Sequence, residues 1–259
     1  MSLKRRQRFG QYRIEARLAT GAFAEVYRAY DTVEGIQVAL KMPHAEHVDA
    51  ETLTLFRREV RLVAKLDHPN ILPIKTAGMI DGRFVIVTAL AEENLAERMT
   101  RRIARKTVLG YIDQLLAGLA HAHRRKTAHL DVKPENVLVF PDNRLRLADF
   151  GLARVMERTL QASGSGTIGY LAPEQAMGKP ALRSDVFAAG LVSWKLLSGA
   201  LPEWPFEWPY PGAERVRRGY HPDLVRLLQR SLSVDQEKRF TTADAMHRAF
   251  GRIRDGALV

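Results

Sequence analysis

The sequence of 259 residues contains no cysteine and no long apolar run. Without cysteine, disulfides and thiolate metal sites are excluded, and a reducing compartment is the natural setting. The chain has no run of about 18 apolar residues and no charged-then-apolar leader, which predicts neither a membrane span nor a secretory signal. We therefore expect a cytoplasmic protein.

Acidic residues are also scarce: the sequence contains 29 Asp and Glu but 40 Lys and Arg, which gives a formal charge of +11. Such a charge can attract nucleic acid or lipid headgroups. The basic residues are scattered, however, and no nucleic-acid module motif accompanies them. We expect a solvated basic surface and no specific nucleic-acid partner; a basic binding module stays open as an alternative that would show strongly salt-dependent binding.

The first 90 residues show the alternating and β-branched patterns of short strands, interrupted by one helical pattern. The predicted strands are Tyr12–Leu18, Glu25–Asp31, Ile36–Met42, Ile71–Ile74 and Arg83–Ala89. Between them, apolar residues recur at helical spacing from Ala50 to Leu66, where His68-Pro69-Asn70 follows. A small antiparallel sheet with one helix is expected.

After Ala91-Glu92-Glu93 the pattern becomes helical, with helices expected at Leu95–Thr100 and Lys106–Arg125. A hairpin of Val137–Phe140 and Leu145–Ala148 turns at Pro141-Asp142-Asn143. The segment Asp185–Ser198 is apolar nearly all round, which predicts a buried helix. This change of pattern marks a boundary between two lobes.

The segment Leu201–Gly212 is rich in proline and contains Trp204 and Trp208, so neither helix nor strand is expected there. It is predicted to be an extended loop packed on the helical lobe. An aromatic docking surface stays open as the alternative, since Trp and Tyr anchor interfaces.

Two short strings carry chemistry. The first is His129-Leu130-Asp131-Val132-Lys133-Pro134-Glu135-Asn136, and the second is Asp149-Phe150-Gly151, which begins 18 residues after Asp131 and across the predicted hairpin. Each alone could be a surface turn. With Val38-Ala39-Leu40-Lys41 and Gly166-Thr167-Ile168-Gly169-Tyr170-Leu171-Ala172-Pro173-Glu174, they resemble the signature set of the Hanks-type Ser/Thr protein kinases from about Tyr12 to Phe250.

The resemblance implies an α+β, bilobal protein-kinase-like fold in a single kinase domain over residues 1–259. The N-terminal lobe would be an antiparallel sheet with one helix at about 10–90, and the C-terminal lobe would be mainly helical at about 91–252. It further implies transfer of the γ-phosphoryl group of ATP, with Mg²⁺ or Mn²⁺, to Ser or Thr of protein substrates.

Catalytic roles follow from the same resemblance. Asp131 would orient the substrate hydroxyl and accept its proton, with Lys133 near the γ-phosphate. Asn136 and Asp149 would bind the metal ions. Lys41 would reach the α- and β-phosphates and pair with Glu59, whose carboxylate would be costly beside an apolar stripe if it stood alone.

Further site residues are assigned by resemblance. The ATP-binding residues would be Leu18, Ala19, Gly21, Val26, Ala39, Lys41, Thr88, Ala89, Ala91 and Leu138. Structural roles would fall to His129, Phe150, Glu174, Asp185 and Arg239. Phe150 is expected to pack inward, Glu174 to pair with Arg239, and Asp185 to accept hydrogen bonds from the catalytic-loop backbone. Thr167 would touch Asp131 and Lys133.

The sequence departs from the family pattern in two places. Only Gly21 remains of the three glycines of the phosphate loop, since Ala19 and Ala24 take the other positions. Their methyl groups restrict the backbone and predict looser phosphate contacts and a lower rate. Leu130 stands where many kinases have the Arg that binds a phosphorylated activation loop. We therefore expect activity without that phosphorylation, although Ser163, Ser165 and Thr167 are candidates for modification.

Two further alternatives stay open. A pseudokinase-like scaffold would bind nucleotide with little turnover, and Ala19 and Ala24 motivate it. A small-molecule kinase of the same fold is a second, against which the Gly166–Glu174 segment argues because it resembles a peptide-binding platform. The short basic ends are also those expected of a catalytic domain excised from a longer protein.

Overall fold

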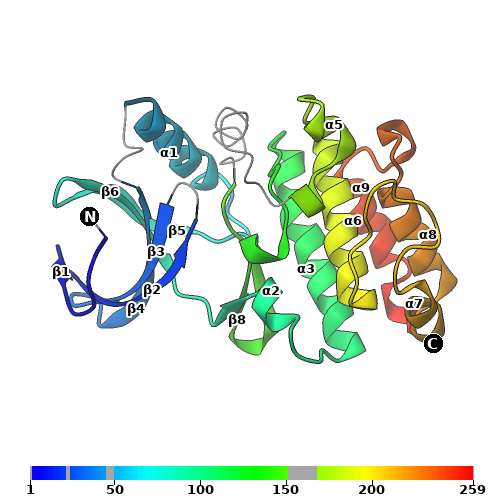
Figure 1. The fold of residues 1–259 in the computed structure, drawn as a ribbon, viewed down its shortest axis with the longest axis horizontal. Coiled ribbons are helices and arrows are strands. Elements are labelled where there is room, and N and C mark those ends of the chain that lie inside the picture. Colours follow the sequence, from blue (N-terminus) through cyan, green and yellow to red (C-terminus); the bar gives the residue numbers. More distant parts are fainter. Residues whose placement is uncertain (1, 22–23, 45–49, 151–167, 259) are drawn as a thin grey trace. The chain divides into compact units, whose positions relative to one another are not determined.

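A computed structural model describes residues 2–21, 24–44, 50–150 and 168–258, apart from the side chains of Ala50, Glu51, Thr52, Leu55, Glu59 and Ile168. The chain divides into two compact units. Unit 1 comprises Met1–Asp67 and Leu72–Ala91, and unit 2 comprises His68–Ile71 and Glu92–Val259. Figure 1 is coloured along the sequence, so unit 1 is mainly blue to teal and unit 2 mainly green to red.

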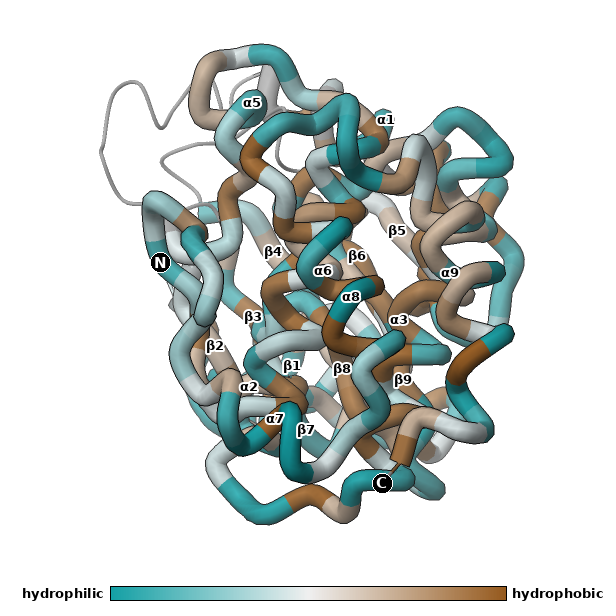
Figure 2. The backbone as a smooth tube through the Cα atoms, turned by 90° about the vertical axis from the view of Figure 1, so that its right-hand side faces the viewer, coloured by the Kyte–Doolittle hydropathy of each residue, from teal (hydrophilic) through white to brown (hydrophobic). Residues whose placement is uncertain are grey.

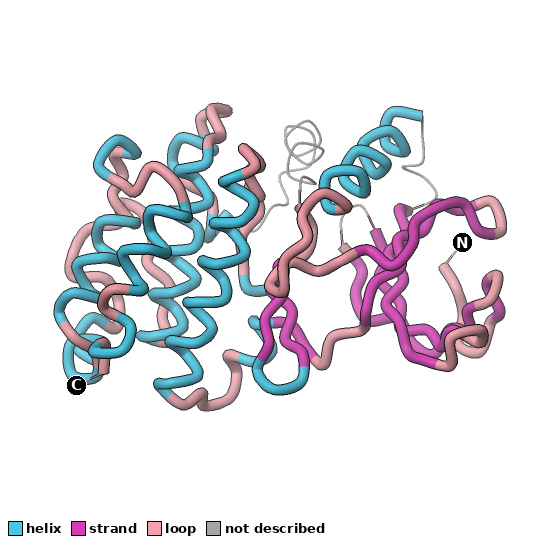
Figure 3. The backbone as a smooth tube through the Cα atoms, turned by 180° about the vertical axis from the view of Figure 1, so that it is seen from behind, coloured by secondary structure: helices cyan, strands magenta, loops and turns pink. Residues whose placement is uncertain are grey.

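Among the described residues of unit 1, six strands form one antiparallel sheet in the order β1-β2-β3-β4-β6-β5. Figure 3 shows strands in magenta. The strands are β1 (Arg8–Phe9), β2 (Tyr12–Thr20), β3 (Ala24–Asp31), β4 (Ile36–Pro43), β5 (Ile74–Ile80) and β6 (Arg83–Ala89). Helix α1 (Ala50–Val63) interrupts them in the sequence. Short connections between sequential antiparallel strands explain why neighbours in the chain are mostly neighbours in the sheet.

Alternation of side chains along the strands gives the sheet one densely packed face. Its buried apolar cluster consists of Phe9, Tyr12, Ile14, Tyr27, Ala29, Val38, Leu40, Met42, Val85 and Val87. The N-terminal segment packs against this cluster through Leu3, whose backbone N–H donates to the Tyr27 hydroxyl at 3.0 Å. The core of unit 1 therefore depends on residues that precede the first strand.

The opposite face carries α1. The Phe56 ring on α1 lies 6.0 Å from the Phe84 ring on β6, and both side chains are buried. Lys41 pairs across the sheet with Ile86, which is two residues from Phe84 and so points to the same side. Lys41 is thus presented on the face that α1 covers.

Unit 2 combines helices with a small antiparallel sheet in the order β7-β8-β9 among its described residues. The strands are β7 (Glu93–Asn94), β8 (Val137–Phe140) and β9 (Arg144–Leu147). The helices are α2 (Leu95–Arg98), α3 (Arg105–Arg124), α5 (Pro173–Ala176), α6 (Leu182–Ser198), α7 (Ala213–Gly219), α8 (Pro222–Ser231) and α9 (Ala243–Gly251). None of the helices in the described ranges is both long enough and apolar enough to cross a membrane.

Helix α6 forms the centre of unit 2. Its residues from Ser184 to Ser193 are all buried, and Trp194 is fully inaccessible. Figure 2 shows hydrophobic residues, in brown, along α6 and α8. Gly199 ends the helix with φ at +81°, a left-handed conformation that glycine adopts without steric cost. The all-round apolar pattern therefore correctly predicted a buried helix.

One predicted strand is wrong. Ile71–Ile74 is not a strand: β5 begins at Ile74, and Ile71 forms an isolated bridge with Leu147 of unit 2. Asn70 explains the difference, because its side-chain amide donates to the carbonyl of Leu145 at 2.9 Å and its own carbonyl accepts from the Leu147 N–H at 2.9 Å. The apolar run is thus tied to the hairpin of unit 2.

The proline-rich segment 201–212 packs on α6, as predicted. The Trp194 ring lies 5.8 Å from that of Trp208 and 5.2 Å from that of Tyr210, both edge to face. The Trp194 indole N–H donates to the carbonyl of Pro211 at 2.9 Å. Trp204, by contrast, is 69% exposed. The segment is an extended loop whose aromatic side chains contribute to the core of unit 2.

Close helix packing predicts opposite effects for two glycines. A methyl group at Gly190 of α6 would lie 2.3 Å from the Ser231 hydroxyl oxygen, whereas one at Gly110 of α3 meets nothing within 4 Å. Gly190→Ala should lower the free energy of unfolding by about 1–3 kcal/mol through overpacking. Gly110→Ala should raise it by about 0.5–1 kcal/mol, because alanine favours a helix interior. Urea denaturation checks both, and equal effects would contradict the packing described here.

Candidate active site

The segment that holds Asp131 has a strained backbone. Leu130 and Asp149 adopt φ angles of +64° and +65°, in the left-handed region that costs residues with a side chain about 1–3 kcal/mol each. Such conformations persist where surrounding contacts fix them. Both positions belong to the two strings that the sequence singled out.

The carboxylate of Asp185 on α6 fixes the first of these positions. Its Oδ2 accepts the backbone N–H of His129 at 2.7 Å, and its Oδ1 accepts that of Leu130 at 2.7 Å. The expected contact between Asp185 and the loop backbone is therefore present. Asp185 is only 1% exposed, so these bonds form away from competing water.

His123 is the third partner of Asp185, and the sequence did not predict it. Its Nε2 lies 2.8 Å from Asp185 Oδ2, while its Nδ1 accepts the backbone N–H of Ala243 at 2.9 Å. The Nδ1 bond requires that the proton sits on Nε2, where it donates to Asp185. A buried carboxylate thus receives three donors, two from the backbone of the 129–130 loop and one from α3.

His129 connects the catalytic loop to the segment before Asp149. Its Nε2 lies 2.9 Å from the carbonyl of Ala148, and its Nδ1 accepts the Asp131 N–H at 3.3 Å. The imidazole also contacts the Phe150 ring at 4.4 Å, and both side chains are completely buried. Phe150 packs inward as expected, and the two strings form one hydrogen-bonded structure.

Asp131 is held by two side chains of its own loop. Lys133 Nζ lies 3.0 Å from Asp131 Oδ2. The Asn136 amide donates to the same carboxylate oxygen at 2.7 Å and to the Asp131 carbonyl at 2.9 Å. The Asp131 side chain remains 21% exposed. An oriented carboxylate with access to solvent is suited to accept a proton from a hydroxyl group.

Asn136 and Asp149 fit a magnesium site. Because both N–H groups of the Asn136 amide bond to Asp131, its carbonyl oxygen is the atom left to ligate a cation. The Asn136 backbone carbonyl also accepts the Ala148 N–H at 2.9 Å, which joins the loop to the residue before Asp149. Within the described residues, no cluster of three or more His, Asp or Glu could hold a metal. Two oxygen ligands suit Mg²⁺, which usually takes its remaining ligands from water and phosphate.

Unit 2 also contains a buried ion pair between Glu174 and Arg239. Arg239, which is 1% exposed, donates from Nη1 and Nη2 to the two oxygens of Glu174 at 2.8 and 3.0 Å. This is the pair expected from the sequence. Burial raises the pKa of Glu174, but the hydrogen bonds from Arg239 and Ser184 outweigh it, and the net pKa lies below the ordinary value of 4.5.

Gln175, next to Glu174, was also missed by the sequence prediction. Its side-chain amide donates to the carbonyl of Leu130 at 2.7 Å, with both groups buried. The strained Leu130 peptide is thus held by Asp185 at its N–H and by Gln175 at its carbonyl. A glutamine on a helix carries no sequence signal for this contact, because its partner lies 45 residues away.

Several predicted nucleotide-binding residues lie together in unit 1. Val26, Lys41, Ala39 and Thr88 share one face of the sheet, because Val26 pairs with Lys41 and Ala39 with Thr88. Leu18 is 50% exposed at the end of β2. Ala19 pairs with Val26 in the same hairpin, and the Gly21 N–H donates to the Ala24 carbonyl at 2.9 Å.

The remaining assignments stay predictions. Ala89 and Ala91 lie at the end of unit 1, whereas Leu138 lies on β8 of unit 2. The Glu59 side chain is outside the described residues, and so are Ser163, Ser165 and Thr167.

The comparisons with known proteins agree with this arrangement. The family model of the protein kinase domain matches residues 12–250. This chain belongs to the protein kinase family. It is 35% identical over 255 residues to the serine/threonine-protein kinase PrkC of Bacillus subtilis, covering 92% of this chain and 39% of that protein.

Other kinases are similarly related. The chain is 37% identical to the serine/threonine-protein kinase PknL of Mycobacterium bovis, over 74% of this chain and 50% of that protein. The chain therefore spans half or less of the length of these relatives. The crystal structure of the Mycobacterium tuberculosis PknI kinase domain matches with a TM-score of 0.72 and 27% identity, covering 97% of this chain and 99% of that one. This kinase thus has the α+β fold expected from its sequence.

The lowered pKa of Glu174 predicts pH-dependent stability. A carboxyl group whose pKa is depressed by folding stabilises the fold above its unfolded pKa, and this contribution is lost as the pH falls through the folded pKa. Glu174→Gln leaves Arg239 without its charge partner, so it should lower the free energy of unfolding by about 3 kcal/mol at pH 7. The difference from wild type should shrink as the pH falls below about 4.5.

Urea denaturation at pH 7 and at lower pH values measures this dependence. Glu237→Gln is the control, because Glu237 pairs with Arg183 but is 67% exposed. It should change stability by at most about 1 kcal/mol at any pH. If the loss of unfolding free energy in Glu174→Gln does not vary with pH, the lowered pKa of Glu174 is contradicted.

Proposed function

We propose that this chain transfers the γ-phosphoryl group of ATP to serine or threonine hydroxyls of protein substrates. The observation that carries the proposal is the Asp131 carboxylate, oriented by Lys133 and Asn136 in a loop whose backbone Asp185 holds. Phosphoryl transfer needs positioning and charge stabilisation more than covalent chemistry from the protein. This site offers both.

Each residue has a role in the proposal. Asp131 orients the hydroxyl and takes its proton, while Lys133 stabilises negative charge on the transferred group. Asn136 and Asp149 hold Mg²⁺, which when bound neutralises charge on the β- and γ-phosphates. From unit 1, Lys41 binds the α- and β-phosphates and is held by Glu59.

Adenine binds against apolar side chains in the same proposal. By resemblance, Val26, Ala39 and Leu138 supply apolar contacts to the ring, with Thr88 and the backbone of Ala89 to Ala91 as further partners. The shared face of Val26, Ala39 and Thr88 in unit 1 supports this role. Leu18, Ala19 and Gly21 cover the phosphates as the phosphate loop.

Specificity for serine and threonine rests on Lys133 and Thr167, which resemble the residues of Ser/Thr-specific kinases. The names of the matched relatives support the same class. The scaffold alternative, motivated by Ala19 and Ala24, gains no support from these relatives. A kinase of small molecules is disfavoured by the segment that ends at Glu174.

Asp131→Asn tests the proposal most simply. Loss of the base should lower kcat for a Ser/Thr substrate about 100-fold or more, with the KM for ATP little changed. The measurement is transfer of labelled phosphate from ATP to a peptide array. Asp142→Asn is the matched control, because Asp142 is an exposed turn residue at φ +62° that asparagine can replace. Equal turnover by wild type and Asp131→Asn would reject the proposed function.

Leu130 leads to a separate prediction about regulation. It offers no guanidinium to an activation-loop phosphate, its side chain is buried, and its carbonyl is already bound by Gln175. Phosphatase-treated protein should therefore work at a rate within about twofold of the phosphorylated form, with no lag in the progress curve. A lag that disappears after preincubation with ATP and Mg²⁺ would show that phosphorylation is required.

A further inference from the structure

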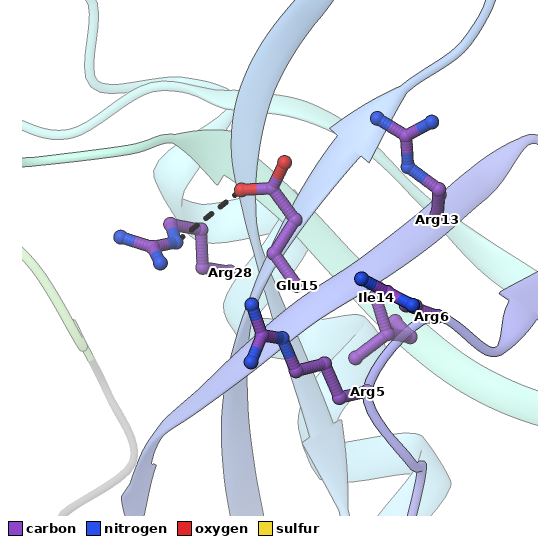
Figure 4. A pocket seen from close by; sticks show the side chains of 6 residues that line it. All are labelled: Arg5, Arg6, Arg13, Ile14, Glu15 and Arg28. Carbon is purple, nitrogen blue, oxygen red and sulfur yellow. Dashed lines mark ion pairs between the residues drawn. The ribbon is translucent and has the colours of Figure 1, made fainter.

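Unit 1 contains a cavity of about 470 Å³ between the N-terminal segment and strands β2 and β3. The residues that line it are Arg5, Arg6, Arg13, Ile14, Glu15 and Arg28 (Figure 4). We call it the arginine pocket. A second cavity of about 650 Å³ shares four of these residues and extends along Ser2, Leu3 and Lys4. Nothing in the proposed transfer reaction uses either space.

The arginine pocket has a strong excess of positive charge. The described residues that line it include four arginines and one glutamate, which gives a net charge of +3. The carboxylate of Glu15 is shared, since its Oε2 accepts from Gln37 Nε2 at 2.7 Å and lies 3.3 Å from Arg28 Nε. Figure 4 shows Glu15 in the middle of the arginines. One carboxylate cannot neutralise this group.

Arg28 has a donor that its surroundings do not satisfy. Its Nε atom is buried, and no acceptor in the described part of the chain meets it with hydrogen-bond geometry, although Glu15 lies within ion-pair distance. A buried donor without an acceptor is costly. The rest of the Arg28 side chain is accessible, since the side chain as a whole is 43% exposed, and an anion in the pocket can bind there.

Two of the pocket residues have contacts that position them before any ligand arrives. The Arg6 N–H donates to the Ile14 carbonyl at 2.7 Å, which fixes the N-terminal segment against β2. The guanidinium carbon of Arg13 lies 5.0 Å from the centre of the Tyr30 ring, so a cation–π contact supports it. Groups that are already ordered lose less entropy on binding.

We propose that the arginine pocket binds the phosphoryl group of a phosphorylated serine or threonine in a peptide. A phosphate dianion balances most of the +3 charge, and its oxygens match the fork of N–H donors on each guanidinium. The adjoining cavity, with Leu3, Ile14 and Ala16 in its wall, gives room for the neighbouring peptide residues. That mixed lining favours a peptide-borne group over a free ion. The pocket is separate from every residue assigned to transfer.

Binding can be measured without ATP, so its failure and the failure of the transfer proposal are distinguishable. The probe is a fluorescent degenerate peptide library with a central phosphothreonine, and its unphosphorylated twin is the comparison. Fluorescence anisotropy with the full chain should show at least about tenfold tighter binding of the phosphorylated library. Arg13→Ala and Arg28→Ala should each weaken it about tenfold, as expected for loss of a charge-assisted hydrogen bond.

Arg218→Ala is the control with the same change of net charge. Arg218 is 80% exposed and pairs with Glu214 on α7, outside unit 1, so its removal should leave binding unchanged. Circular dichroism checks that each variant is folded. If Arg28→Ala does not fold, Arg13→Ala alone tests the proposal, because the Arg13 side chain is exposed. Equal affinity for the unphosphorylated twin, or full binding by the Arg13 variant, would overturn the proposal. Inorganic phosphate that binds as tightly as the peptide would overturn its peptide part.

Discussion

The contact on which unit 2 depends is the buried carboxylate of Asp185. It receives the backbone N–H groups of His129 and Leu130 at 2.7 Å and the imidazole of His123 at 2.8 Å. A buried carboxylate is costly unless donors surround it, so this one holds its three partners in a single arrangement. The strained Leu130 peptide, and with it the direction of the Asp131 side chain, follows from that arrangement. The rigid α6 therefore determines the geometry of the loop.

The other polar contacts of unit 2 extend this arrangement in two directions. His129 connects the loop to Ala148 by a hydrogen bond and to Phe150 by a ring contact, next to the proposed metal ligand Asp149. Gln175 connects the loop to the neighbouring residue Glu174, because its amide binds the Leu130 carbonyl. Arg239 in turn binds Glu174 by a bidentate ion pair. Unit 1 uses a different principle, since strand pairing places Lys41 on the face shared with α1. The positions proposed to bind phosphate or metal are thus carried by elements whose own conformations are fixed.

The sequence predicted what depends on local pattern or on a recognised motif. Alternating and β-branched patterns, with one continuous apolar run, located four of the strands of unit 1 nearly to the residue. The apolar segment before Ser198 located α6. Motif resemblance predicted the Asp185 and Glu174 contacts. His123 and Gln175 were missed because a buried polar side chain is recognised by its partner, which lies 62 and 45 residues away. The strand at Ile71 failed because Asn70 binds the hairpin of unit 2, a tertiary contact that overrides local propensity.

The most direct test of this account is the kcat of Asp185→Asn in the transfer of phosphate from ATP to a Ser/Thr peptide. The amide has nearly the same shape, but it has one acceptor oxygen and adds N–H donors that oppose those of the loop. The account predicts a fall in kcat of about 100-fold, with the KM for ATP changed by no more than about threefold, because the loop is misplaced while unit 1 is untouched. A kcat equal to that of wild type in a folded Asp185→Asn protein would contradict it.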